Sequence, residues 1–481
     1  MELNSIYWFR QDLRLSDNPA LISASEKGNF LPIYILDDIN SGEFKIGGAS
    51  RVWLYHSLSI LDESLGSKLN FYLGDPCTII LDIVNRLNIK FVTWNRCYEP
   101  WRIERDLIIK KELRKNNVRV ETFNGSLLWE PWEVLNQDRK FYRVFTPFYN
   151  KGCLLKKPPR MPLEKPKELK LTEKDFKSVD ISDLNLLPKT NWHKSLTSLW
   201  KFGEKNAKKR LKSFLIEGLK GYKMGRNFPG KQNVSRISPY LHTGELSPNQ
   251  VWYEAKHSKE LKDLTSFHSE IVWREFSYYL LYHFPNLPKN NFQEKFNLFP
   301  WNSHQKNFDL WKRGMTGYPI VDAGMRELYK TGYMHNRTRM IVGSFLVKNL
   351  LIHWRYGELW FWDCLFDADL ANNSASWQWI AGSGADAAPY FRIFNPVLQG
   401  QKFDPDGIYT LKFVPELRKI PKKYLFSPWL APKTILKNAG IELGVTYPEP
   451  VIELKESREK ALSAFEKIKK NRDVQFNFNS W

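Results

Sequence analysis

Short apolar runs that alternate with helix-like segments restrict the fold of the N-terminal part more than any other feature. Helix-like stretches such as 52–65 and 104–115 separate five of these runs, which are Ile6–Phe9, Pro32–Leu36, Asn70–Leu73, Phe91–Trp94 and Val118–Phe123. Runs of this kind are typical of strands buried on both faces, and the intervening helices favour βαβ units. The sequence therefore predicts an α/β N-terminal domain with a parallel, Rossmann-like sheet.

The glycine pattern argues against a standard dinucleotide site. No G-x-G-x-x-G follows the first apolar run. The segment 382–387 imitates that fingerprint, but no strand-like run precedes it, so we discount it.

The remaining chain divides by composition. Strand and helix signals end at about Glu130, and a segment rich in proline and lysine follows. From about Ser195 onward helix signals dominate, and 341–354 reads as one buried apolar helix. Ser238-Pro239 and Ser247-Pro248 each read as an N-cap followed by Pro in the first turn. We expect an α/β domain at 1–130, a connector at 131–195 and a large all-α domain at 196–481.

Charge and aromatic content are the unusual bulk properties. The 72 Lys and Arg residues against 52 Asp and Glu give a net charge of +20, which favours a polyanionic partner such as nucleic acid. A lysine bias spread over solvated faces would give the same total. The four cysteines form no C-x-x-C pair, so neither a metal site nor a disulfide framework is indicated. With no signal peptide or membrane-length apolar run, we expect a cytoplasmic protein without membrane contact.

A loop before a predicted helix start is the first segment that suggests chemistry. It contains Tyr222 and the run Val234-Ser235-Arg236-Ile237-Ser238. Backbone N–H groups at a helix start, two hydroxyls and a guanidinium suit a diphosphate. An ordinary capped helix would explain the same residues.

Three further segments combine polar and aromatic groups. Glu270, Trp273 and Arg274 have helical i, i+3 and i+4 spacing, so a carboxylate, a ring and a guanidinium share one face, as nucleobase binding requires. A surface ion pair beside a core Trp has the same pattern. The run 332–340 places two arginines and an amide around an apolar Met, although alone it could be a polar helix start, and 367–379 ends in Trp-Gln-Trp. On a helix Trp377 and Trp379 would differ by about 200° and face different surroundings.

Together these residues resemble the photolyase/cryptochrome family, and within it the bacterial class I cyclobutane pyrimidine dimer photolyases. The resemblance runs from Trp8-Phe9-Arg10-Gln11-Asp12-Leu13-Arg14 to Phe391-Arg392-Ile393-Phe394-Asn395-Pro396 and so covers most of the chain. The run 316–322 and the Trp-Gln-Trp segment are its most specific parts.

The resemblance implies a function and the residues that carry it. It implies light-driven repair of cyclobutane pyrimidine dimers in DNA, by electron transfer from photoexcited reduced FAD to a flipped-out dimer. FAD would lie in the helical domain, against residues that match the family's cofactor positions: Tyr222, Val234, Ser235, Arg236, Ile237, Ser238, Phe267, Arg274, Asp367, Ala368, Asp369 and Asn373. Val234 departs from the usual Thr, which removes a hydroxyl but keeps the backbone N–H.

The resemblance also assigns substrate and electron-transfer residues. Those that match its substrate and DNA contacts are Glu270, Trp273, Arg274, Ser277, Asn336, Arg337, Met340 and Trp379, and those that match its catalytic and electron-supply positions are Glu270, Asn373, Trp377, Trp354 and Trp301. Core packing is the alternative explanation for each tryptophan of the chain of three. The expected partner is damaged DNA, double- or single-stranded, and we expect a monomer without an obligate protein partner.

Three alternatives remain. A cryptochrome-type blue-light receptor is disfavoured by Asn373, where plant-type receptors tend to carry Asp. Six-four photoproduct repair is disfavoured because 335–340 lacks the histidines of that subgroup. A non-enzymatic nucleic-acid-binding module would explain the charge but not the Trp-Gln-Trp segment. A second, antenna chromophore, folate or deazaflavin, is expected in the N-terminal domain without a fixed identity, since Trp101-Arg102 stands where folate-binding members often carry Asn-Glu.

Overall fold

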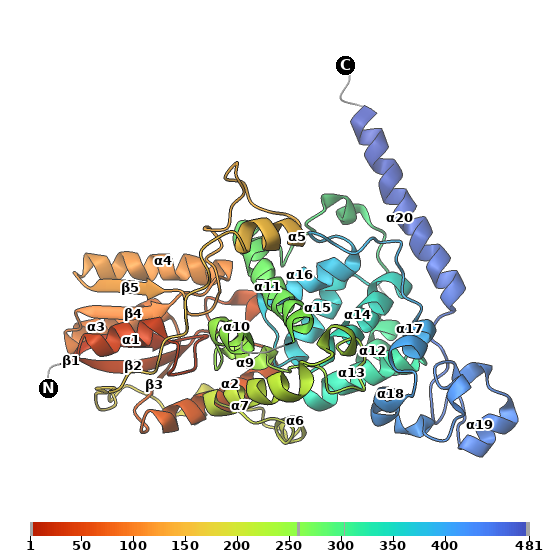
Figure 1. Ribbon diagram of the computed structural model, residues 1–481, viewed down its shortest axis with the longest axis horizontal. Helices are drawn as coiled ribbons and strands as arrows, with labels where there is room; N and C mark the ends of the chain where they lie inside the picture. The colour runs from red at the N-terminus through yellow and green to blue at the C-terminus, as the bar shows by residue number, and fades with distance from the viewer. Residues whose placement is uncertain (1–2, 257–259, 303, 478–481) are drawn as a thin grey trace. The chain divides into compact units, whose positions relative to one another are not determined.

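A computed structural model describes residues 3–256, 260–302 and 304–477 (Figure 1). The chain forms two compact units. The first unit contains residues 1–220, 235–285 and 366–371, and the second unit contains residues 221–234, 286–365 and 372–481.

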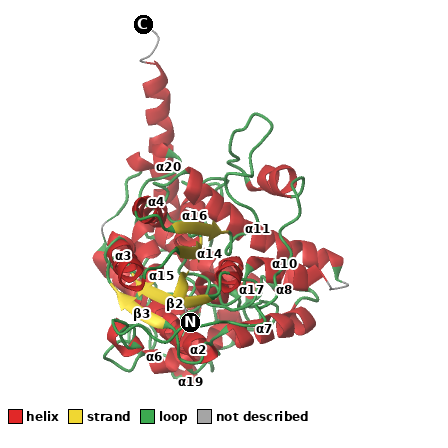
Figure 2. Ribbon diagram, turned by 90° about the vertical axis from the view of Figure 1, so that its left-hand side faces the viewer, coloured by secondary structure: helices red, strands yellow, loops and turns green. Residues whose placement is uncertain are grey.

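The first unit is built on a five-stranded parallel sheet with the strand order β3-β2-β1-β4-β5. Figure 2 shows the strands of this sheet in yellow among the helices. Its strands are β1 (Leu3–Phe9), β2 (Asn29–Leu36), β3 (Asn70–Leu73), β4 (Phe91–Asn95) and β5 (Arg119–Phe123). Each apolar run singled out in the sequence lies on one of these strands, so the predicted parallel sheet is confirmed.

Helices cover both faces of this sheet. Tyr7 and Phe9 of β1 enter a core shared with α1 (Pro19–Glu26) and α2 (Gly48–Ser64). Ile6 and Trp8 enter a second core shared with α3 (Pro76–Leu87) and α4 (Pro100–Lys115). Because successive side chains of a strand point to opposite faces, an unbroken apolar strand can supply both cores.

The rest of the first unit is largely helical. A long irregular segment follows β5 and returns to the sheet, where the Val179 N–H donates to the Phe71 carbonyl at 2.9 Å. The other elements are η1 (Gly42–Phe44), α5 (Phe145–Pro147), η2 (Phe148–Cys153), η3 (Ile181–Leu184), α6 (His193–Thr197), α7 (Glu204–Ser213), η4 (Phe214–Gly218), α9 (Ser238–Thr243), α10 (Pro248–Lys256) and α11 (Leu261–His283).

The second unit consists of helices and short helical turns, which confirms the predicted helical C-terminal part. Its elements are α8 (Tyr222–Gly225), η5 (Glu294–Leu298), α12 (Gln305–Arg313), α13 (Pro319–Thr331), α14 (Asn336–Ser344), η6 (Phe345–Asn349), α15 (Trp354–Cys364), most of α16 (Leu370–Ala381), α17 (Pro396–Phe403), α18 (Ile408–Phe413), η7 (Pro415–Leu417), η8 (Lys422–Tyr424), η9 (Pro428–Leu430), α19 (Lys433–Ala439) and α20 (Leu454–Asn477). One core of this unit packs Phe296, Phe299 and Tyr390 against Phe465 and Ile468 of α20.

The single apolar helix expected at 341–354 is wrong, although the segment is buried as expected. The chain leaves α14 through the π turn η6, and Leu351 adopts a left-handed backbone with φ 55°. The Leu351 carbonyl accepts the Asn302 N–H at 2.7 Å. A new helix starts at Trp354, where the His353 ring nitrogen Nδ1 accepts the Arg355 N–H at 3.1 Å. An outside hydrogen bond and a local cap therefore replace the continued helix.

One of the two predicted serine caps is confirmed. Ser247 Oγ accepts the Gln250 N–H at 2.9 Å at the start of α10. Ser238 does not act as a cap, since its hydroxyl donates to Asp367 at 2.5 Å instead.

Candidate active site

Helix α11 of the first unit positions the predicted carboxylate, ring and guanidinium. Phe267 is buried on this helix, whereas Glu270, Trp273 and Arg274 are half-buried. Phe145 stacks on the Trp273 ring with a centroid distance of 3.8 Å and an interplanar angle of 6°. The helical spacing inferred from the sequence is therefore present, and Phe145 is a neighbour of Trp273 that the spacing did not reveal.

Arg274 is fixed by three contacts within the first unit. Its Nη1 donates to the Ser126 carbonyl at 3.0 Å and to Glu275 Oε1 at 3.1 Å, and its guanidinium lies 4.8 Å from the centre of the Tyr278 ring. Burial raises the pKa of Glu275 to about 7, although Arg274 opposes this shift. A guanidinium held in this way is a preorganised positive charge.

Ser277 lies one helical turn beyond Trp273. It is buried, and its hydroxyl donates to the Trp273 carbonyl at 3.1 Å. Its predicted DNA contact stays a prediction.

A carboxylate pair lies in the segment 366–371 of the same unit. The Asp369 N–H donates to the Asp367 carbonyl at 2.8 Å, with buried Ala368 between them. Asp367 accepts the Ser238 hydroxyl, and Asp369 accepts the Tyr278 hydroxyl. Burial, and then the Asp369 charge, raise the pKa of Tyr278 well above its usual value, so Tyr278 keeps its proton. Two hydroxyl donors therefore orient the two carboxylates.

The loop before α9 has a backbone suited to an anion. Arg236 has a positive φ of 54°, and Ile237 follows at φ −94° and ψ −4°. When two successive residues have backbone conformations of opposite handedness, their N–H groups point to one side and form an anion-binding nest. Arg210 Nε holds this loop by donating to the Ser235 carbonyl at 2.7 Å. The residues present fit a diphosphate.

The second unit carries the other predicted cofactor and substrate positions. Tyr222 is buried on α8, and Val234 is half-buried. On α14 Asn336 is exposed and Met340 half-buried, while the Arg337 side chain donates to Asn227.

The three tryptophans predicted for electron supply lie within the second unit, and so does His353. Trp301 lies 5.0 Å from His353 between ring centroids, and His353 lies 5.5 Å from Trp354. Burial and the neighbouring Arg355 lower the pKa of His353 to about 4, so its ring is neutral at neutral pH. His353 was not among the residues predicted from the sequence, although it directly precedes Trp354.

Trp377 is packed against α15 at a point where a side chain would not fit. A Cβ added to Gly357 would lie 2.1 Å from the Trp377 ring, so this position requires glycine. Trp377 also lies 4.9 Å from Phe361 and 6.3 Å from Trp311 between ring centroids. Trp379 is half-buried while Trp377 is buried, as the helical angle between them suggested.

Polar side chains of α16 hold their surroundings in place. Asn373 Nδ2 donates to the Glu358 carbonyl at 3.0 Å. Gln378 Nε2 donates to the carbonyls of Leu287 and Asn290 at 2.7 and 2.8 Å, and its oxygen accepts the Phe292 N–H at 2.8 Å. The Gln of the Trp-Gln-Trp segment is therefore a structural anchor.

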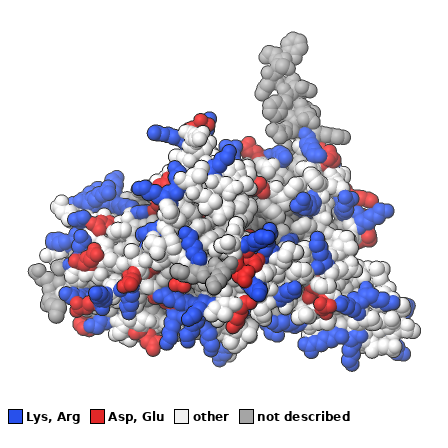
Figure 3. Space-filling view, viewed as in Figure 1, with Lys and Arg blue, Asp and Glu red and all other residues white. Residues whose placement is uncertain are grey.

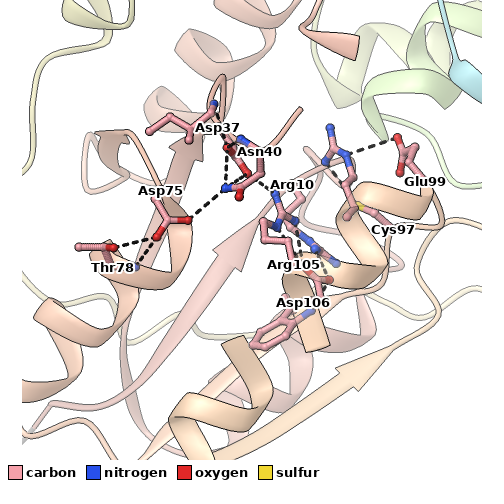
Figure 4. Close-up of polar contacts among 12 residues, drawn as sticks. Arg10, Asp37, Asn40, Asp75, Thr78, Cys97, Glu99, Arg105 and Asp106 are labelled. Carbon is pink, nitrogen blue, oxygen red and sulfur yellow. Dashed lines mark hydrogen bonds and ion pairs between the residues drawn. The ribbon is translucent and has the colours of Figure 1, made fainter. Parts of the chain in front are cut away.

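A second polar group lies at the carboxyl edge of the sheet in the first unit (Figure 4). Arg10 follows β1 and pairs with Asp106 at 2.6 Å, and Arg105 pairs with Asp106 at 2.8 Å and with Asp37, after β2, at 2.9 Å. Burial disfavours the Asp106 charge, but the two guanidinium groups still hold its pKa below the usual value.

This group lies where the strand order reverses. In open α/β sheets, ligands bind at this edge, at the point of reversal. Beside it, the Arg102 guanidinium lies 4.6 Å from the centre of the Trp101 ring. An antenna chromophore at this edge stays a prediction.

Family comparisons agree with this arrangement. The family model for the DNA photolyase domain matches residues 5–167, and that for the FAD binding domain of DNA photolyase matches residues 267–467. A deoxyribodipyrimidine photo-lyase of Agrobacterium fabrum is 48% identical over 97% of this chain and 98% of its own length. Cryptochrome-2 of Arabidopsis thaliana is 36% identical over 99% of this chain and 80% of its own length.

A solved structure shows the same fold. The bacterial class III photolyase of Agrobacterium tumefaciens superposes with a TM-score of 0.93 and 46% identity, covering 98% of both chains. The sequence resembles class I photolyases, whereas this similar structure is named a class III photolyase. Among the described residues, no helix is long and apolar enough to cross a membrane. By its two domains, its cofactor FAD and its full-length relatives, the chain belongs to the DNA photolyase and cryptochrome family.

Proposed function

We propose that this enzyme repairs cyclobutane pyrimidine dimers in DNA by light-driven electron transfer from reduced FAD to a flipped-out dimer. The observation that supports this most is the face of α11, where Glu270, a ring supported by Phe145 and a fixed Arg274 occur together. A dimer inside a duplex is hidden by stacking, so it must leave the stack to meet such a face.

FAD, when bound and reduced, supplies the electron that absorbed light makes available. The nest at 235–238 would bind its diphosphate, and Arg274, Asp367 and Asp369 would lie near its ring system together with Phe267 and Ala368. Tyr222, Val234 and Asn373 are proposed as the second unit's share of this role. The oriented carboxylates and the fixed guanidinium need no rearrangement when charge moves, which is the condition for electrostatic preorganisation.

The substrate role falls to α11, α14 and α16. Trp273 and Trp379 would stack on the dimer, since each offers a half-buried ring. Glu270 would hydrogen-bond a base and stabilise charge on its carbonyl group. Asn336, Arg337, Met340 and Ser277 are proposed as neighbouring DNA contacts.

The electron supply is proposed to follow Trp377, Trp354 and Trp301. Trp354 is fully buried, and its Nε1 donates to Asn291 Oδ1 at 2.9 Å, which fixes its ring. The neutral His353 ring contacts both Trp354 and Trp301 and adds no charge that would oppose passage of a positive hole.

The decisive experiment measures loss of dimers from irradiated DNA. Purified protein is reduced, mixed with dimer-containing DNA, and either illuminated with blue light or kept dark. Repair only under illumination is the expected result. Bound flavin with no repair under either condition would contradict this proposal and favour the alternative of a cryptochrome-type blue-light receptor without repair activity.

A further inference from the structure

A short part of the second unit carries a large excess of positive charge. Between residues 402 and 437 there are eight Lys and Arg residues against three Asp and Glu residues. The eight bases are all exposed, and we call them the basic patch: Lys402, Lys412, Arg418, Lys419, Lys422, Lys423, Lys433 and Lys437. Figure 3 shows Lys and Arg side chains gathered over the region that Figure 1 labels α18 and α19.

The three acidic residues of the segment do little to neutralise the patch. Asp404 is buried and accepts the N–H groups of Tyr409 and Thr410 at 3.0 and 2.7 Å. Glu416 pairs with Arg326, which lies outside the patch, at 2.7 Å. Asp406 alone pairs with a patch residue, Lys422, at 2.6 Å. Among the residues that the structure describes, no carboxylate pairs with Arg418, Lys419, Lys433 or Lys437.

The segment is a packed scaffold, so these charges are held at defined places. Buried side chains alternate with the exposed bases, among them Phe413, Leu417, Leu425 and Phe426. Gly407 begins α18 with a φ of 69°. An exposed base on a buried framework keeps a polyanion near without the ordering cost of a flexible tail.

The patch continues from a residue already proposed to contact DNA. The Arg337 guanidinium lies 4.3 Å from the centre of the Phe403 ring, and the Lys402 ammonium lies 5.3 Å from the same ring. Arg337 and the first base of the patch therefore share one aromatic neighbour within the second unit.

We propose that the basic patch binds the phosphate backbone of duplex DNA that flanks the lesion. This inference rests on the proposed function. Separate exposed Lys and Arg side chains suit a duplex, which presents a phosphate about every 1.7 Å along its axis. A single strand would in addition call for open aromatic stacking platforms. Phe413 and Phe426 of this segment are buried, and its half-buried rings already have partners: Phe403 contacts Arg337, Tyr424 contacts Lys423 and Trp429 contacts Tyr318. The patch would add affinity and orientation without reading sequence.

The test compares two variants with equal loss of charge. The patch variant carries Arg418→Gln, Lys419→Gln, Lys433→Gln and Lys437→Gln. The control carries Arg114→Gln, Lys90→Gln, Lys111→Gln and Lys167→Gln, which replace exposed bases of the first unit. Dissociation constants are measured for duplexes of about 10 and about 40 base pairs, each with one central dimer, over a range of salt concentrations; the longer duplex offers many more flanking phosphates.

The patch variant should bind the long duplex on the order of tenfold more weakly, and its salt slope should fall by about 2–4, at ~0.9 per lost phosphate contact. The short duplex and the repair rate at saturating DNA should change little. If the patch and control variants lost the same affinity for DNA, the proposal would be overturned, because the effect would be one of net charge in general. Equal losses of affinity for the short and the long duplex would overturn it as well. A failure of the proposed function would look different, because wild-type protein would then bind duplexes without repairing dimers.

Discussion

Phe145 covers one face of the Trp273 ring at a centroid distance of 3.8 Å, so a substrate base would use the opposite face. Replacing Trp273 with Ala should weaken binding to dimer-containing DNA by roughly 1–3 kcal/mol, the usual contribution of one base–aromatic stack. Titration of a fluorescent dimer-containing oligonucleotide measures this. Trp192→Ala, at a tryptophan that is 39% exposed in the same unit, is the control and should leave binding unchanged. Wild-type affinity in the Trp273 variant would place the substrate elsewhere.

A substitution at Trp377 would distinguish the supply of electrons to the flavin from the repair reaction itself. Phe at this position keeps most of the packing volume beside Gly357 but removes a ring that is easily oxidised. Light-driven reduction of the oxidised protein should therefore fall sharply, as followed by flavin absorbance with a thiol present. After chemical reduction with dithionite the variant should still repair dimers. Unchanged photoreduction would make Trp377 a packing residue, and lost repair after dithionite would place it in the reaction itself.

At the scale of single residues, the sequence predicted chemistry better than contacts. The spacing of Glu270, Trp273 and Arg274 placed them on one helix, which is local information. Neither Phe145, more than a hundred residues away from Trp273, nor the need for glycine at position 357 could be read from local spacing, since both depend on tertiary packing. The family resemblance, not periodicity, singled out Asp367, Asp369 and Asn373.

At the scale of elements, the π turn η6 places a lysine in the interior. Lys348 is fully buried, and its Nζ donates to the Arg392 carbonyl at 3.2 Å. Burial, and then the charge of Arg392, lower the pKa of Lys348 to about 7. The unfolded chain, with a lysine pKa near 10.4, therefore binds more protons between about pH 7 and pH 10.

Stability should consequently rise with pH across that window, and the destabilisation caused by Lys348 should grow as the pH falls toward 7. Lys348→Met should remove this dependence and stabilise the protein at pH 7, because no charge is then buried. Urea unfolding midpoints of both proteins at pH 7, 8 and 9 test this through their difference, which cancels the titration of other groups. A difference that does not change with pH would show that Lys348 titrates normally.

The elements themselves were predictable to unequal degrees. Four of the five strands could be read from the sequence because each contains a short, mainly apolar run, whereas β5, with the sequence Arg-Val-Glu-Thr-Phe, has the weakest apolar signal. The helix at 341–354 could not, because its interruption depends on the bond between Asn302 and the Leu351 carbonyl, which no local pattern records. Ser238 resembled a cap, but a carboxylate distant in sequence competed for its hydroxyl.

At the scale of the whole molecule, the cofactor should contribute to stability. A ligand that binds the folded chain alone stabilises it by RT ln(1 + [L]/Kd), about 2.7 kcal/mol at a free concentration of about 100 times Kd. Protein stripped of FAD should therefore unfold at a lower temperature, and added FAD should restore the midpoint in a concentration-dependent way. Denatured holoprotein should release one FAD per chain into solution, which shows that the bond is not covalent.

The nest at 235–238 makes this prediction specific. Riboflavin lacks the diphosphate, so it should raise the unfolding temperature less than FAD does. Arg236→Gly and Arg236→Val both remove the guanidinium, but Arg236→Gly should keep more of the FAD effect, because glycine adopts a positive φ freely whereas a β-branched residue resists that backbone. Asp406→Asn, at an exposed carboxylate, is the control and should behave as wild type. Equal responses to riboflavin and FAD would show that the loop does not bind the diphosphate, and the phosphate-binding role would then have to move to other residues of the chain.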